Sequence, residues 1–80
     1  MSVKVKLFSK NNCMPCRQTK MFLEARNIPY EDFNLNDHPE YIEEVHKYGF
    51  QAAPVIVPEE ESGLSPWFGF RPDELKKLVD

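Results

Sequence analysis

Apolar and polar residues alternate along residues 3–8, with valine and leucine on one face and lysine on the other. This period of two predicts a half-buried strand. Residues 15–26 place apolar side chains at helical spacing, with Pro15 near the start and Asn27 after the end, and they predict a helix. Residues 30–35 alternate again in their second half and predict another strand. A strand, a helix and a strand in this order predict two parallel strands joined by a right-handed crossover.

The middle of the chain predicts a second helix followed by a short strand. Asp37 and Glu40 have the spacing of a capping box, apolar residues then recur at helical intervals, and Gly49 ends the segment. The β-branched run 55–57 lies between two prolines and predicts a strand. Residues 59–65 are acidic and contain glycine, and they predict a turn.

The last segment predicts a very short strand at residues 67–68 and then a helix that starts at Pro72. We expect Asp73 to cap or favour this helix and Arg71 to hold the preceding loop by hydrogen bonds. The inner face of the helix is predicted to consist of Leu75, Leu78 and Val79. The resulting order, β-α-β-α-β-β-α, is typical of a thioredoxin-like or glutaredoxin-like α/β fold, with a four-stranded mixed sheet and three helices.

Composition predicts a single domain over residues 1–80. The 80 residues are 41% hydrophobic and 29% charged, which is ordinary for a soluble domain, and a chain of this size supports only one small core. No apolar stretch is long enough to span a membrane, and the first ten residues lack the apolar block of a secretory signal. We therefore expect a cytoplasmic protein that acts as a monomer.

Charge and histidine content argue against two classes of ligand. The formal net charge is −3 and the ten lysines and arginines form no electropositive stripe, so we expect no nucleic acid partner. His38 and His46 are further apart in sequence than the histidines of common zinc sites, so we expect no metal site. His38 is expected at the surface near a helix N-terminus, and His46 is expected to be half-exposed beside Val45.

The two cysteines, Cys13 and Cys16, lie in the turn between the first predicted strand and helix. A disulfide between residues this close in sequence closes a very small loop and stabilises the fold little, so the pair indicates reactive chemistry. Cys13 is expected at the helix N-terminus, where free N–H groups and the helix dipole stabilise a thiolate, and it is the predicted nucleophile. Cys16 lies one turn later, within disulfide reach and more buried, and it is the predicted resolving thiol.

Two further segments have alternative interpretations. Lys10, three residues before Cys13, either lowers the pKa of the thiol or is an ordinary solvated loop lysine. Pro54 either simply starts the third strand or forms a cis peptide bond that directs the backbone of Ala53 toward the Cys13 sulfur. The spacing of the residues leaves both choices open.

Three groups of residues together resemble a known family. They are a lysine three residues before C-x-x-C, the run Ala53-Pro54-Val55, and the stretch from Trp67 to Asp73, which reads Trp-Phe-Gly-Phe-Arg-Pro-Asp. Over essentially its whole length the chain resembles the NrdH-redoxins, glutaredoxin-sized members of the thioredoxin superfamily. The resemblance implies a thiol–disulfide oxidoreductase without a bound cofactor, reduced by NADPH through thioredoxin reductase and donating electrons to a class Ib ribonucleotide reductase. It also implies that the two cysteines are the redox pair and that Pro54 is a cis-proline.

The chain departs from this family at two places. Phe68 stands where the family usually has serine, and the turn 59–65 is longer and more acidic than usual. A glutathione-dependent glutaredoxin is the alternative, but such proteins usually carry Thr-Val-Pro and a Gly-Gly pair followed by Asp, and Phe68 is expected to crowd the glutathione position. An iron–sulfur or metal carrier is a further alternative, although carriers of this kind usually present a single thiol.

We expect an exposed and largely apolar surface for partner proteins around the nucleophile, because residues from three loops converge there in this fold. Its predicted members are Met14, Pro15, Ala53, Pro54, Trp67, Phe68 and Gly69. Strand alternation allows only one of Trp67 and Phe68 to point into the core. The alternative is that both aromatic side chains serve packing.

Overall fold

The computed structural model describes residues 3–79, so the ends of the predicted domain, residues 1, 2 and 80, lie outside the described part. Within that part it contains the predicted four-stranded mixed sheet and three α-helices. The strands are β1 (Val5–Ser9), β2 (Tyr30–Asn34), β3 (Val55–Pro58) and β4 (Trp67–Phe68), and the α-helices are α1 (Met14–Ala25), α2 (Ile42–Lys47) and α3 (Pro72–Leu75). Short 3-10 helices occupy Pro39–Tyr41, Glu60–Ser62 and Lys76–Leu78.

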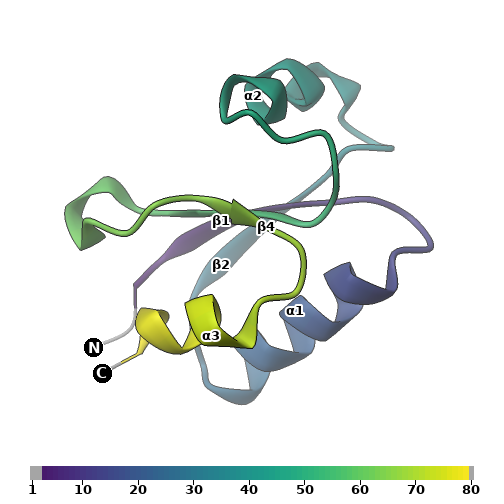
Figure 1. Cartoon of the computed structure of the whole chain (residues 1–80). Coiled ribbons are helices and arrows are strands. Elements are labelled where there is room, and N and C mark those ends of the chain that lie inside the picture. Colours follow the sequence, from purple (N-terminus) through teal and green to yellow (C-terminus); the bar gives the residue numbers. More distant parts are fainter. Residues whose placement is uncertain (1–2, 80) are drawn as a thin grey trace.

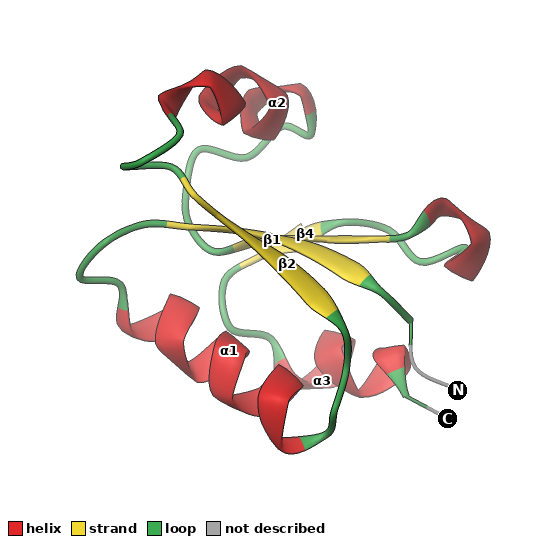
Figure 2. Ribbon diagram, turned by 180° about the vertical axis from the view of Figure 1, so that it is seen from behind, coloured by secondary structure: helices red, strands yellow, loops and turns green. Residues whose placement is uncertain are grey.

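The sheet has the strand order β2-β1-β3-β4, with β1 parallel to β2 and antiparallel to β3, and β3 antiparallel to β4. The parallel pairing predicted from the strand–helix–strand order is confirmed. Figure 1 shows α1 and α3 on one face of the sheet and α2 on the other, and Figure 2 shows the same layers from behind. β1 lies inside the sheet and pairs with a strand on each side. The turn that carries the cysteines connects β1 to α1, so it starts from a strand that is held on both edges.

The larger apolar cluster lies on the face of the sheet covered by α1 and α3. Its buried members are Val5, Leu7, Leu23, Ile28, Ile56, Trp67, Leu75 and Leu78. The predicted inner face of the last helix is confirmed, because Leu75 and Leu78 are buried and Val79 packs against the cluster.

A second, smaller cluster covers the opposite face of the sheet beneath α2. Its buried members are Phe8, Val45 and Val55. The ring of Phe8 stacks on Phe33, with 5.5 Å between centroids, and meets Tyr41 at 6.0 Å. The prediction that the first strand is half-buried is therefore wrong, since Lys6 is the only exposed residue of β1. Alternation identified the two faces of the strand correctly but could not show that α2 covers the second face.

One predicted helix cap is wrong, and at a second position only one of the two predicted roles is confirmed. Asp37 does not cap α2, because the 3-10 helix Pro39–Tyr41 precedes α2 and neither helix begins with a side-chain capping bond. Asp73 lies in the first turn of α3, where its charge favours the helix, but it does not cap it, and Arg71 occupies the N-cap position. These two segments, which begin without a side-chain cap, each have a proline at the start that pre-sets the helical backbone angle.

The first two α-helices end at the predicted residues, whereas α3 ends at Leu75 and continues as the 3-10 helix Lys76–Leu78. Asn27 follows α1 with φ of 56°, and Gly49 follows α2 with φ of 87°, so both adopt the left-handed conformation that terminates a helix. The acidic segment 59–65 folds into a short 3-10 helix that ends at Gly63, and the Ser62 hydroxyl donates to the backbone oxygen of Glu59 over 2.7 Å. The longer turn is thus an ordered extension at the end of β3.

Phe8 tests the second apolar cluster. Because its side chain is fully buried, Phe8→Ala is expected to lower the free energy of unfolding by about 3–5 kcal/mol, and Phe8→Leu by less, because it removes less buried volume. Urea unfolding followed by circular dichroism measures both changes. Met21→Ala, at a side chain that is 68% exposed, is the control and should change this free energy by less than about 0.5 kcal/mol. Losses at Phe8 no larger than in the control would show that α2 does not pack on the sheet.

Candidate active site

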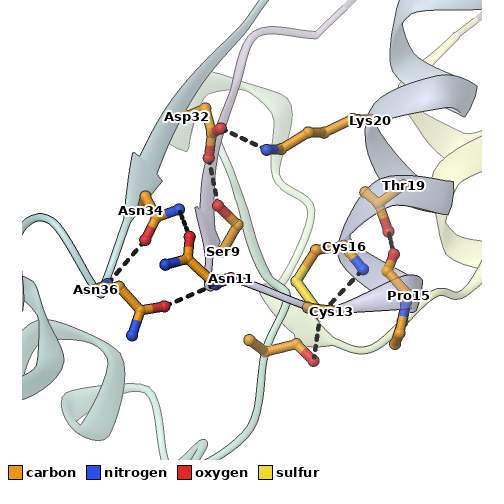
Figure 3. Close-up of a disulfide and its surroundings, with 11 residues drawn as sticks. Ser9, Asn11, Cys13, Pro15, Cys16, Thr19, Lys20, Asp32, Asn34 and Asn36 are labelled. Atoms are coloured by element: carbon orange, nitrogen blue, oxygen red, sulfur yellow. Dashed lines mark hydrogen bonds and ion pairs between the residues drawn. A yellow bond between two sulfur atoms is a disulfide. The ribbon is translucent and has the colours of Figure 1, made fainter.

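The turn between β1 and α1 holds both cysteines at the start of a helix. Cys13 is the N-cap residue of α1 and has an extended backbone, while Cys16 lies in the first helical turn. The two sulfur atoms form a disulfide, and the Cα atoms are 5.2 Å apart. The backbone N–H of Cys16 donates to Sγ of Cys13 over 3.2 Å, as Figure 3 shows. In the reduced protein, this N–H and the helix dipole favour a thiolate at Cys13.

Both cysteines are largely shielded from solvent. Cys13 is 6% exposed and Cys16 is 2% exposed. Behind them, the buried Thr19 hydroxyl donates to the backbone oxygen of Pro15 over 2.8 Å, which ties together the first turns of α1. Of the two residues, Cys13 is thus slightly the more accessible from outside.

The loop before β3 approaches the disulfide from the other side. The peptide bond between Ala53 and Pro54 is cis, as the family resemblance implies. The backbone oxygen of Ala53 lies 3.9 Å from Sγ of Cys13. The backbone N–H of Gly69 donates to the backbone oxygen of Pro54 over 2.8 Å, so the residue after β4 is joined to the same loop. Three segments that are distant in sequence therefore meet at the disulfide.

Only part of the predicted partner surface is exposed. Met14 is 60% exposed and Phe68 is 51% exposed. The half-buried members of the predicted set are Pro15, Ala53 and Gly69. Pro54 and Trp67 are buried, so the prediction that they contribute exposed apolar surface is wrong.

Strand pairing explains why the two aromatic residues of β4 differ. Trp67 is paired with Ile56 and belongs to the cluster beneath α1 and α3. Phe68 is paired with Val55 and faces the other side of the sheet, where its ring meets Phe50 with 5.3 Å between centroids. Alternation correctly required one inward and one outward ring, and the pairing register determines that the outward ring is Phe68.

Lys10 lies in the loop before the disulfide, and its side chain is exposed. Within residues 3–79, it makes no hydrogen bond to Cys13. It instead lines a surface cavity of about 250 Å³ that also includes Ala53. The other residues around this cavity are Leu35, Asn36, Ile42, Val45, His46, Gln51 and Ala52. Because Ala53 contacts the Cys13 sulfur, the cavity begins directly beside the disulfide.

Sequence reasoning missed a polar network that connects α1 to the sheet. The fully buried Ser9 hydroxyl donates to Oδ1 of Asp32 over 2.6 Å, and Nζ of Lys20 lies 2.7 Å from Oδ2 of the same carboxylate (Figure 3). These residues come from β1, β2 and α1, respectively, and Lys20 lies one helical turn after Cys16. A serine that directly follows the apolar Leu7 and Phe8 at the end of the first strand was the available signal for this network.

Asparagines hold the loop between β1 and the disulfide. The backbone N–H of Asn11 donates to Oδ1 of Asn36 over 2.6 Å, and Nδ2 of Asn34 donates to Oδ1 of Asn11 over 3.0 Å (Figure 3). Asn12 has φ of 55°, a left-handed conformation that asparagine tolerates better than most residues. The chain therefore reaches Cys13 through a loop whose direction is fixed by side-chain hydrogen bonds.

Arg71 and Asp73 pair with each other beyond β4. Nη2 of Arg71 donates to Oδ2 of Asp73 over 2.8 Å, and Nε donates to Oδ1 over 3.2 Å. This hydrogen bonding holds the pKa of Asp73 below its ordinary value and raises the pKa of Arg71. Within the described residues, the side chain of Arg71 bonds only to Asp73 and, at 3.8 Å, pairs with Glu74, so its predicted role of holding the preceding loop is wrong.

Both histidines are exposed, as predicted for His38, whereas His46 was predicted to be only half-exposed. His38 lies 3.3 Å from a carboxylate oxygen of Glu40, and His46 borders the cavity beside Lys10. Across residues 3–79, no group of three or more His, Cys, Asp or Glu side chains has an arrangement suited to a metal ion. In the same part of the chain, none of the helices has the length and apolar character needed to cross a membrane.

Comparison with known proteins agrees with this geometry. A family model described as Glutaredoxin matches residues 5–62. The chain is 42% identical to the glutaredoxin-like protein NrdH of Lactococcus lactis subsp. lactis over 75 residues, which cover 94% of this chain and 99% of that protein. It is 32% identical to the NrdH protein of Escherichia coli K12 over 76 residues, covering 95% of this chain and 89% of that protein. The chain belongs to the NrdH group of the glutaredoxin family.

Solved structures support the same assignment. The NrdH-redoxin of Escherichia coli superimposes with a TM-score of 0.85 at 30% identity, and the match covers 96% of each chain. A glutaredoxin of Archaeoglobus fulgidus matches with a TM-score of 0.79 at 23% identity, which reflects the shared fold. The predicted family and fold are confirmed. This NrdH-type protein is a thiol–disulfide oxidoreductase, and Cys13 and Cys16 are its redox-active pair.

The polar network can be tested by a double-mutant cycle. Ser9→Ala is expected to lower the free energy of unfolding by about 1–2 kcal/mol, because it removes a buried hydrogen bond, and Lys20→Met should cost less, because its ion pair is partly exposed. Both partners bind one carboxylate, so the two substitutions should show a coupling of about 0.5 kcal/mol or more in urea unfolding. The coupling should vanish in an Asp32→Ala background. Coupling that persists there would mean that the carboxylate does not connect the two residues.

Proposed function

We propose that this NrdH-type redoxin carries electrons from thioredoxin reductase to a class Ib ribonucleotide reductase in the cytoplasm. NADPH supplies the electrons through the reductase, so the redoxin itself binds no cofactor. The observation that carries the proposal is the near full-length likeness to the NrdH-redoxin of Escherichia coli, a glutaredoxin-like protein described as having a thioredoxin-like activity profile. The exposed Phe68 ring supports it further, because the next residue, Gly69, is hydrogen-bonded to the loop beside the disulfide and we expect so bulky a ring there to crowd glutathione.

The first chemical step is attack by the Cys13 thiolate on a disulfide of the target enzyme. The sulfur–sulfur bond of the target breaks, one target sulfur leaves as a thiolate, and the other becomes joined to Cys13. The N-cap position favours this attack, because the N–H of Cys16 and the helix dipole stabilise negative charge on the sulfur. Lys10, exposed three residues earlier, adds positive charge to the same end of the helix.

The second step is attack by Cys16 on the Cys13 sulfur. The mixed disulfide breaks, the second target sulfur leaves as a thiol, and the intramolecular disulfide forms, so two electrons pass from the redoxin to the target. The 5.2 Å separation of the two Cα atoms suits this bond. Because Cys16 is buried, it reaches Cys13 more readily than it reaches an outside disulfide.

Partner proteins are proposed to contact the exposed and half-buried residues around the disulfide. These residues are Met14, Pro15, Ala53, Phe68 and Gly69. The cavity beside Ala53 offers a partner segment a recess of mixed apolar and polar lining that includes Lys10. Trp67 and Pro54 act indirectly, because they position β4 and the loop from beneath the surface.

The order of thiol attack can be tested by alkylation. When the reduced protein is treated with limiting iodoacetamide near pH 7, Cys13 should be labelled first, because the free N–H groups at the start of α1 favour a thiolate there and Cys13 is the more exposed of the two residues. Trypsin leaves both cysteines in one peptide, residues 11–17, so fragmentation mass spectrometry is needed to locate the label. Preferential labelling of Cys16 would reverse the two assignments.

A trapping experiment provides the matched control. Cys16→Ser should accumulate mixed disulfides with a target disulfide, whereas Cys13→Ser, which removes one sulfur in the same way, should form few. Non-reducing gels measure both. Equal trapping by the two variants would contradict a fixed order of attack.

The electron donor can be tested by following NADPH oxidation with a model disulfide as the final acceptor. Wild type should turn over with thioredoxin reductase and should be at least about tenfold slower with glutathione and glutathione reductase, a difference that corresponds to about 1.4 kcal/mol. Phe68→Gly should gain glutathione-dependent turnover, because it removes the exposed ring. It should retain turnover with thioredoxin reductase, because the other proposed contact residues are unchanged. Phe50→Leu, at the neighbouring half-buried ring, is the control and should gain little. Efficient reduction of the wild type by glutathione alone would support a glutathione-dependent glutaredoxin instead.

A further inference from the structure

The outward face of α1 carries two exposed methionines. Met14 is 60% exposed and Met21 is 68% exposed, more than any other large apolar side chain within residues 3–79. Because they are seven residues apart, they lie on the same face of the helix, about 10 Å from each other along its axis. A surface helix ordinarily places charged or polar side chains at the centre of its outward face. Packing within the chain does not account for these two methionines.

The same face carries positive charge that the rest of the chain does not balance locally. Arg17 is exposed and lies between the two methionines along the helix. The first 23 residues contain no Asp or Glu, so all thirteen acidic residues of the chain follow them. Within residues 3–79, no carboxylate pairs with Arg17 or Lys10. A protein of net charge −3 therefore presents unpaired cations beside its disulfide.

We propose that the face of α1 formed by Met14, Arg17 and Met21 is a docking surface for an acidic polypeptide segment that adjoins the disulfide of a partner protein. This surface, the methionine–arginine face, is continuous with the active site, because α1 begins at Cys13. The proposal rests on the proposed role of Cys13 as the attacking thiol. It extends that role by adding a selection among partners according to the residues that flank the target disulfide.

The length and chemistry of the methionine–arginine face define the segment that it accepts. A span of about 10 Å corresponds to about three residues of extended chain, so acidic and apolar residues within about four positions of the target cysteine can reach it. Arg17 pairs with a carboxylate in that segment. The methionines pack against its apolar side chains, since flexible thioether chains adapt to varied surfaces.

Synthetic peptides test this selection directly. Each peptide has nine residues and a central cysteine joined by a disulfide to 2-nitro-5-thiobenzoate. The acidic peptide carries glutamate and leucine on both sides of the cysteine, the basic peptide has lysine in place of glutamate, and a third has serine in place of leucine. The chemically reduced redoxin converts each peptide disulfide to two thiols while its own two cysteine thiols become a disulfide. The released nitrothiobenzoate is followed by its absorbance.

Wild type is expected to reduce the acidic peptide about tenfold faster than the basic peptide at low ionic strength, and high salt should remove most of this difference. Arg17→Glu should abolish or reverse the preference. Lys47→Glu makes the same change of charge at an exposed residue of α2, on the opposite face of the sheet, and should keep the preference within about twofold of wild type. This control separates the local effect of Arg17 from the effect of net charge.

The apolar part of the surface has its own measurement. Met21→Gln, which keeps the side-chain length, should lower the rate with the leucine-containing acidic peptide about threefold and leave the rate with its serine counterpart unchanged. Met21→Leu should restore the rate, because it restores apolar area. Far-ultraviolet circular dichroism confirms that each variant is folded.

The outcomes separate failure of this inference from failure of the proposed chemistry. Equal rates of wild type with all three peptides would overturn the docking surface and leave the order of thiol attack intact. The docking surface would also be overturned if Lys47→Glu changed the preference as much as Arg17→Glu. If wild type reduced none of the peptides, the attacking role of Cys13 and the docking surface would both be wrong.

Discussion

The free backbone N–H groups in the first turn of α1 are the feature on which the redox site depends. They place a hydrogen-bond donor 3.2 Å from the Cys13 sulfur, in the one part of the helix where negative charge is favoured. A cysteine elsewhere on the helix would lack both effects. The surrounding structure holds this helix start in place. A central strand precedes it, a loop fixed by asparagine hydrogen bonds leads into it, and the Ala53 backbone faces it.

Burial on both faces of a small sheet determines which residues remain available for partners. One apolar cluster uses α1 and α3, and the other uses α2, so the sheet is covered on both sides by a chain of only 80 residues. Trp67 is absorbed by the first cluster, whereas Phe68 is directed to the surface by the same two-residue strand. The apolar side chains that stay exposed near the disulfide are therefore those that neither apolar cluster buries. For this reason they indicate where a partner protein binds.

Polar groups between α1 and the sheet complete this support. The Asp32 carboxylate accepts from the buried Ser9 hydroxyl and pairs with Lys20, so it ties the helix to two strands one turn beyond Cys16. A carboxylate in a partly buried position is tolerated because both of its oxygens have partners. Since the remaining cations of the first 23 residues near the disulfide lack such carboxylates within the described residues, they stay available to steer an acidic partner.

Local sequence alone determined the strand and helix order, the cysteine pair at a helix start, and the helix ends at Asn27 and Gly49, because periodicity, turn chemistry and helix capping depend on near neighbours in the chain. The motif from Trp67 to Asp73 identified the family for the same reason, since it is a continuous run. Tertiary structure decided that Phe8 is buried, that Trp67 rather than Phe68 points inward, and that Ser9, Lys20 and Asp32 meet. Each of these facts depends on which helix covers which face and on the register between strands, and these long-range pairings leave no trace in the spacing of residues along one segment.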